Sequence, residues 1–264
     1  MTFFEVDGVR LHFRLDGPAE GPPLLLSNSL GADVHMWDAQ VPALSARYRV
    51  VRYDGRGHGA SGFSAGPYDL ELLGRDALGL LDHLDIERAH ICGVSMGGLV
   101  ALWLSVHHPE RVASAVFANT AAKIGTPDTW GERISIVEKK GMLGIRDFLL
   151  ERFFTSGLVE RDPATVERVG RTLVEMPPDA YVASCRAVEG ADLRREVETI
   201  RAPSLIVAST EDRSTPLADS EWLHARIPNS RLVVIERAAH LSNVEQPGRF
   251  NEAVVSFLEE ADRG

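Results

Sequence analysis

The chain has 264 residues and a formal charge of −10 at pH 7, because 38 acidic side chains outnumber 28 basic ones. Hydrophobic residues make up 44% and charged residues 25%, an ordinary globular composition that excludes disorder, collagen or coiled coil as a description of the whole chain. The length suits one large domain or two small ones, and the acidic balance without a Lys/Arg-rich run argues against a nucleic-acid partner.

The predicted elements begin with a β-hairpin and continue as strands that alternate with helices. Strands Phe3–Val6 and Val9–Leu15 flank Asp7-Gly8, a strong two-residue turn signal. Six further strands are expected at Leu24–Leu26, Tyr48–Tyr53, Ala89–Val94, Val112–Ala118, Ser204–Ala208 and Leu232–Ile235. Helices are expected at Asp69–Leu84, Gly98–His107, Leu217–Arg226 and Gly248–Glu260. This order predicts an α/β fold with a mostly parallel, eight-stranded sheet covered by helices on both faces.

The alternation stops between about residues 121 and 198, where we find no strand pattern. Helical patterns fill this stretch at Trp130–Glu138, Gly144–Phe154, Pro163–Glu175 and Asp179–Val188. We therefore expect a core domain formed by residues 1–120 and 199–264, and a helical cap formed by residues 121–198.

The remaining sequence features indicate the setting in which the chain works. The first residues lack the basic and apolar stretches of a signal peptide, and no run of about 18 apolar residues predicts a membrane span. The two cysteines, Cys92 and Cys185, form neither a disulfide framework nor a zinc pattern. We expect a cytoplasmic protein with no membrane partner, and its oligomeric state is left open.

The pattern Gly93-x-Ser95-x-Gly97 lies between an apolar strand and a helix. In that context it is typical of a serine nucleophile on a sharp turn, where the glycines relieve crowding. The turn also directs the N-terminus of the next helix at the reacting carbonyl, so that the Met96 N–H can stabilise an oxyanion. A second oxyanion donor is expected in the loop after Leu24–Leu26, at the Leu30 N–H.

A serine hydroxyl needs a base, and on this kind of sheet the order along the chain is serine, acid, histidine. Of the nine histidines, His240 is the best candidate, because it follows a strand and precedes the last helix. Asp212 follows the strand Ser204–Ala208 and is the preferred acid, with Glu211 as its rival. The acid would hold the tautomer of His240 and stabilise its imidazolium.

The whole pattern resembles the α/β-hydrolase family and, within it, the 3-oxoadipate enol-lactonases of aromatic catabolism (the β-ketoadipate pathway). The resemblance covers nearly the whole chain, although Thr210–Arg213 departs somewhat from the pattern of that group. The segments that carry it are Ser27–Gly31 with Met36–Asp38, Tyr53–Ser61, Gly93–Gly98, Asn119–Gly125 with Trp130 and Arg133, and Ala239–Asn243 with Glu245–Pro247.

The resemblance implies an esterase that hydrolyses a small lactone bearing a carboxylate, with no metal and no organic cofactor. The substrate carboxylate needs a cation, for which we nominate Arg133 beside Trp130, since arginine binds carboxylates with two parallel hydrogen bonds. The alternative for Arg133 is a surface ion pair with Glu132 or Glu138. Alternative functions are a general carboxylesterase, a C–C hydrolase or a perhydrolase of the same fold, and, in another class, a ligand receptor without enzymatic activity.

Overall fold

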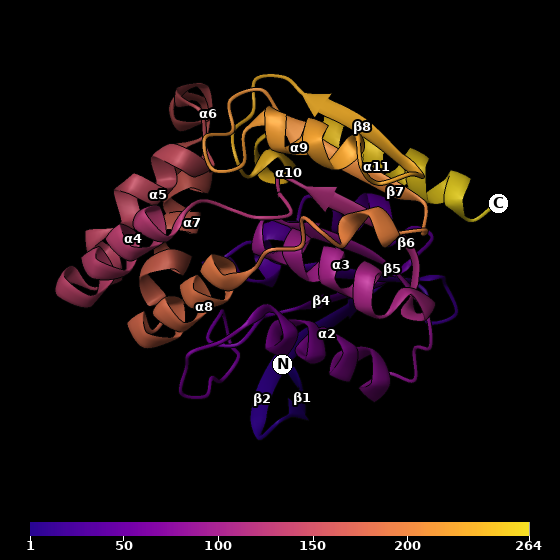
Figure 1. Ribbon diagram of the computed structural model, residues 1–264, viewed down its shortest axis with the longest axis horizontal. Helices are drawn as coiled ribbons and strands as arrows, with labels where there is room; N and C mark the ends of the chain where they lie inside the picture. The colour runs from indigo at the N-terminus through magenta and orange to yellow at the C-terminus, as the bar shows by residue number, and fades with distance from the viewer. Residues whose placement is uncertain (264) are drawn as a thin grey trace.

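The computed structural model describes residues 1–263, which form one eight-stranded sheet flanked by helices (Figure 1). The strand order is β1-β2-β4-β3-β5-β6-β7-β8; β1 and β2 pair antiparallel, as do β2 and β4, and all other pairs are parallel. The predicted α/β fold with a mostly parallel sheet of eight strands is therefore confirmed. The strands are β1 Thr2–Val6, β2 Val9–Asp16, β3 Pro23–Ser27, β4 Arg49–Tyr53, β5 Ala89–Val94, β6 Val112–Ala118, β7 Ser204–Ser209 and β8 Ser230–Ile235.

The helices of the core cover the sheet. Helices α2 and α3 pack against each other, and in Figure 1 they lie in front of the strands; α11 packs against α1 and against β6, β7 and β8. These helices are α1 Val41–Leu44, α2 Leu70–His83, α3 Met96–His107, α9 Leu217–His224, α10 Ser242–Glu245 and α11 Pro247–Ala261. Short 3₁₀ turns lie at Val34–Trp37, Pro109–Arg111, Met142–Gly144 and Val197–Thr199.

Helix α2 illustrates how local signals produce these elements. The Asp69 carboxylate accepts a hydrogen bond from the Leu72 N–H at 2.7 Å and so caps the first turn. Leucine and alanine side chains three or four residues apart are buried along one face. The helix therefore begins at Leu70, directly after the predicted first residue Asp69, which caps it.

Five helices lie between β6 and β7, and Figure 1 shows them gathered at one end of the sheet. They are α4 Pro127–Lys140, α5 Arg146–Phe153, α6 Ser156–Arg161, α7 Pro163–Glu175 and α8 Pro178–Gly190. Four match the predicted helical patterns, whereas α6 was not predicted, because six residues are too few to show a periodic apolar face. The division into two domains stays a prediction.

The parallel register brings the ends of three central strands to the same edge of the sheet. Val94 of β5 pairs with Ala118 of β6, which in turn pairs with Val207 of β7. The residues that follow these strands, from Ser95, Asn119 and Thr210 onward, therefore lie along one edge of the sheet.

The described residues expose 11,188 Å², close to the roughly 11,000 Å² that surface scaling predicts for a folded chain of this size. Both cysteines are buried and unpaired. Among residues 1–263, no helix is long and apolar enough to span a membrane, and no cluster of three acidic, histidine or cysteine side chains could hold a metal ion.

Candidate active site

Ser95 lies on a strained turn between β5 and α3. Its backbone has φ 57° and ψ −114°, a left-handed conformation that costs a residue with a side chain about 1–3 kcal/mol. The two flanking glycines permit the turn. A Cβ on Gly93 would lie 2.0 Å from the Gly97 carbonyl oxygen, and one on Gly97 would lie 2.1 Å from the Ser27 carbonyl oxygen. The glycines are thus required by the approach of α3 to β5 and β3.

The structure brings His240 and Asp212 together. His240 Nδ1 lies 2.9 Å from Asp212 Oδ2 and 3.1 Å from Oδ1, and both side chains are buried. Burial alone would raise the pKa of Asp212, but the charge and hydrogen bond of His240, together with hydrogen bonds from Thr215, lower it to about 2. The Asp212 carboxylate is therefore held ionised beside the imidazole.

Glu211, the rival acid, is directed elsewhere. It is exposed, and its backbone N–H donates to the Ala238 carbonyl oxygen at 3.0 Å. The contact with His240 thus comes from Asp212 and not from its neighbour.

Ser95 and His240 line the same cavity, which has a volume of about 210 Å³. Both hydrogen bonds of the His240 ring use Nδ1, so among residues 1–263 Nε2 is left for the serine hydroxyl. The Phe153 ring stacks on the imidazole, with centroids 5.9 Å apart and planes inclined by 22°. Catalytic hydrogen bonds commonly tighten only when substrate binds, so transfer of the serine proton to His240 stays a prediction.

Leu30 and Met96, the predicted oxyanion donors, also line this cavity. Within the described part of the chain, neither of their backbone N–H groups donates a hydrogen bond, whereas the Gly31 N–H next to them donates to His58 Nε2 at 3.0 Å. Gly31 has φ 82°, a left-handed backbone conformation that suits glycine. Within residues 1–263, two backbone donors without an acceptor thus border the cavity that Ser95 also lines.

Asn119 supports the site, and the sequence analysis did not identify it. Its Nδ2 donates to Asp212 Oδ2 at 3.0 Å and to Ser209 Oγ at 2.7 Å, and its Oδ1 accepts from Ser242 Oγ at 2.5 Å. Its φ of 44° turns the chain at the end of β6. The signal available in the sequence was its position, directly after the strand between those that carry Ser95 and Asp212.

Arg133 and Trp130 both line the cavity. The Arg133 guanidinium lies over the Trp130 ring, 4.5 Å from its centroid, and Trp130 Nε1 donates to the Ile124 carbonyl oxygen at 2.7 Å. Within residues 1–263 Arg133 forms no ion pair with Glu132 or Glu138, the alternative considered for it. Its guanidinium is thus available to the cavity, although its role there stays a prediction.

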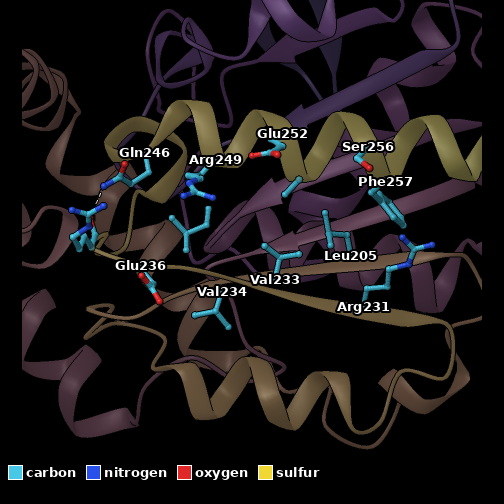
Figure 2. A pocket seen from close by; sticks show the side chains of 13 residues that line it. Leu205, Arg231, Val233, Val234, Glu236, Gln246, Arg249, Glu252, Ser256 and Phe257 are labelled. Atoms are coloured by element: carbon cyan, nitrogen blue, oxygen red, sulfur yellow. Dashed lines mark hydrogen bonds between the residues drawn. The ribbon is translucent and has the colours of Figure 1, made fainter.

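A larger groove of about 580 Å³ lies elsewhere, between β8 and α11 (Figure 2). Valine side chains line it from the strand, and Arg249, Glu252 and Ser256 line it from the helix. It contains no histidine that could activate a nucleophile, so the smaller cavity at Ser95 is the candidate active site.

Comparisons with known proteins agree with this geometry. The family model described as alpha/beta hydrolase fold matches residues 22–247. The chain is 42% identical over 250 residues to 3-oxoadipate enol-lactonase 2 of Acinetobacter baylyi, which covers 95% of this chain and 93% of the relative. It is 39% identical to 3-oxoadipate enol-lactonase 1 of the same organism, over 95% of this chain and 94% of the relative. The crystal structure of the enol-lactonase from Burkholderia xenovorans superposes with a TM-score of 0.96 at 40% identity, covering 98% of this chain and all of that one.

Proposed function

The chain belongs to the α/β-hydrolase family, and we propose that it hydrolyses 3-oxoadipate enol-lactone to 3-oxoadipate through an acyl-enzyme on Ser95. The observation that carries the proposal is the meeting of three features at one cavity: the serine turn, the His240–Asp212 pair and two unoccupied backbone donors. The names of the relatives supply the substrate. The proposed reaction uses only side chains and backbone groups of the chain, without a metal or an organic cofactor.

Acylation begins when Ser95 Oγ attacks the lactone carbonyl carbon and its proton passes to His240 Nε2. Asp212, ionised beside Nδ1, stabilises the imidazolium. The carbonyl oxygen gains negative charge, which the Leu30 and Met96 N–H groups and the N-terminus of α3 stabilise. Loss of one such donor typically costs about 10²–10³ in rate.

Ring opening follows when the bond between the carbonyl carbon and the ring oxygen breaks. The ring oxygen leaves as an enol, protonated by His240, and tautomerises to the ketone. Water then attacks the acyl carbon and gives a proton to His240, which returns it to Ser95 Oγ as the carboxylate is released. The product carries two carboxylates, one present in the substrate and one formed by the reaction.

The existing carboxylate of the substrate requires a cation in a chain of charge −10. We propose Arg133 for this role, with its guanidinium positioned by the Trp130 ring, 4.5 Å from the ring centroid. Residues 121–198 would act as the cap that supplies both residues, over a core formed by residues 1–120 and 199–264. We also propose that the enzyme works in the cytoplasm on this small molecule, without a nucleic-acid partner.

The test is the loss of ultraviolet absorbance of the enol-lactone, followed side by side for the wild type and for Ser95→Ala. We expect fast multiple turnover by the wild type and none above background by the variant. Turnover by Ser95→Ala at the wild-type rate would refute the acyl-enzyme, and a wild type faster on simple neutral esters than on the lactone would make the chain a general carboxylesterase.

The role of Arg133 is tested with Arg133→Ala on two substrates. KM for the lactone should rise sharply, whereas KM for a neutral ester such as p-nitrophenyl acetate should change little. Equal losses on both substrates would remove Arg133 from carboxylate recognition.

A further inference from the structure

Two more arginines line the cavity at Ser95 besides Arg133. They are Arg152, in the last turn of α5, and Arg213, directly after Asp212. Among the described residues, the one carboxylate that lines the cavity is that of Glu132, which is exposed. Within residues 1–263, none of the three guanidiniums forms an ion pair with a carboxylate, so positive charges outnumber negative ones around this small cavity in an acidic chain.

Arg152 is held in place without an acidic partner. Its guanidinium lies over the Phe148 ring, 4.4 Å from the centroid, and its Nη1 donates to the Arg213 carbonyl oxygen at 3.4 Å. Burial and the nearby charges of Arg133 and Arg213 lower the pKa of Arg152, and the charge of Asp212 opposes this only in part. Like charges kept close together and partly buried are unfavourable until an anion joins them.

The three arginines reach the cavity from three different segments of the chain. Arg133 and Trp130 lie near Ile124, to whose carbonyl oxygen the Trp130 ring donates. Arg152 lies beside the histidine loop, because its own carbonyl oxygen accepts from the His240 N–H at 3.4 Å. The cavity therefore has one cation near Trp130 and two beside the loops that carry His240 and Asp212.

We propose that Arg152 and Arg213 form a second carboxylate-binding site, so that the cavity binds linear dicarboxylates of about six carbons better than monocarboxylates. This inference rests on the proposed function, in which ring opening creates a new carboxylate next to His240. One carboxylate of the ligand meets Arg133, and the other meets Arg152 and Arg213. The enzyme is consequently inhibited by its own dicarboxylate product.

The probe is adipate, a dicarboxylate of six carbons, compared with hexanoate, a monocarboxylate of the same length that no esterase can cleave. Isothermal titration calorimetry at pH 7.5 and low salt measures both dissociation constants on the full chain. A hydrogen bond between charged groups is worth about 1.5–3 kcal/mol, so adipate should bind roughly 10- to 100-fold more tightly than hexanoate.

Two variants assign the preference to the proposed residues. In the double variant Arg152→Gln/Arg213→Gln, the affinities for adipate and hexanoate should become nearly equal. Arg213→Gln alone changes an exposed residue, so the chain should fold normally and the preference for adipate should be reduced. Arg249→Gln is the matched control: it removes the same charge from the groove between β8 and α11 and should leave the ratio unchanged. Thermal melts followed by circular dichroism verify folding.

The outcomes separate this inference from the proposed function. The second carboxylate site would be overturned by equal affinities of the wild type for adipate and hexanoate. It would also be overturned if the preference for adipate survived in both Arg213→Gln and the double variant. Either result would stand even if the enzyme opens the lactone. A strong adipate preference that depends on Arg152 and Arg213 would uphold the site even if the lactone is not hydrolysed.

Discussion

Replacing Asp212 with asparagine tests the centre of the proposed machinery, because the substitution keeps the shape and removes the charge. The Asp212 carboxylate accepts hydrogen bonds from five groups. They are His240 Nδ1, Asn119 Nδ2, the Ser214 and Thr215 N–H groups and Thr215 Oγ1. An asparagine has one oxygen and one NH₂ group, so either orientation sets a donor against a buried donor.

The size of the effect on stability follows from these contacts. A buried donor without an acceptor costs about 1–3 kcal/mol. The pKa of Asp212, lowered to about 2 from an ordinary value of 3.8, corresponds to about 2 kcal/mol of stabilisation at neutral pH. The two contributions overlap, so we expect Asp212→Asn to lower the free energy of unfolding by about 2–4 kcal/mol at pH 7.

The difference in unfolding free energy between the wild type and Asp212→Asn should depend on pH in a definite direction. A carboxylate with a lowered pKa in the folded state stabilises the protein above its unfolded pKa, and the stabilisation disappears as pH falls through the folded value. The gap in unfolding free energy between wild type and Asp212→Asn should therefore be constant above about pH 5 and should narrow between about pH 4 and pH 2. Urea denaturation at a series of pH values measures it.

Activity should fall more steeply than stability. Without the carboxylate, His240 loses the partner that fixes its tautomer, and kcat should drop by on the order of 10⁴. Glu211→Gln is the matched control, since its side chain is exposed, and it should retain near wild-type kcat. The reasoning is refuted if Glu211→Gln loses as much activity as Asp212→Asn, or if Asp212→Asn keeps kcat within a factor of about ten.

Two further substitutions probe the strain and the support of the site. Ser95→Gly should abolish hydrolysis yet raise the melting temperature by about 2–4 °C, because glycine adopts the φ of 57° at little cost. An unchanged or lower melting temperature would argue against backbone strain at residue 95. The buried Glu245 carboxylate accepts hydrogen bonds from the Ala239 N–H, beside His240, and from the Thr155 N–H in the proposed cap. Glu245→Gln should therefore lower the free energy of unfolding by about 1–3 kcal/mol. It should also reduce kcat more than it raises KM. Melting curves and steady-state kinetics measure both effects, and a rise in KM with unchanged kcat would contradict a role of Glu245 in holding the histidine loop.

The sheet could be predicted from the sequence because several of its central strands, such as β5, β6 and β7, are short apolar runs. The predicted first residues of two helices were less accurate, because the apolar pattern drew more attention than the residues that start the helix. Helix α4 was predicted from Trp130, the first residue of its apolar face, but begins at Pro127, because Thr126 caps it and a proline suits the first helical position. Helix α3 begins at Met96, two residues before the prediction, because the Gly97-Gly98 pair hides the start of the helix.

The order of Ser95, Asp212 and His240 along the chain could be predicted, since parallel strands end at one edge of the sheet. The sequence could not separate Asp212 from Glu211, because adjacent residues after a strand point in different directions, and only the turn determines which one meets the histidine. Arg152 and Arg213 could not be found either. They come from separate segments, and no local pattern marks them as neighbours.

The end of α5, which belongs to the segment that we propose as the cap, is attached directly to the histidine loop, and this attachment has a consequence for catalysis. The His240 and Leu241 N–H groups donate to the carbonyl oxygens of Arg152 and Phe153, at 3.4 and 3.1 Å. Phe153 stacks on the imidazole, and Thr155 bonds to Glu245, just beyond the same loop. A displacement of the end of α5 must therefore move the imidazole together with the Arg152 guanidinium. Substitutions that loosen the packing of α5 should consequently change kcat and ligand affinity together, whereas a cap that only covered the cavity would change affinity alone.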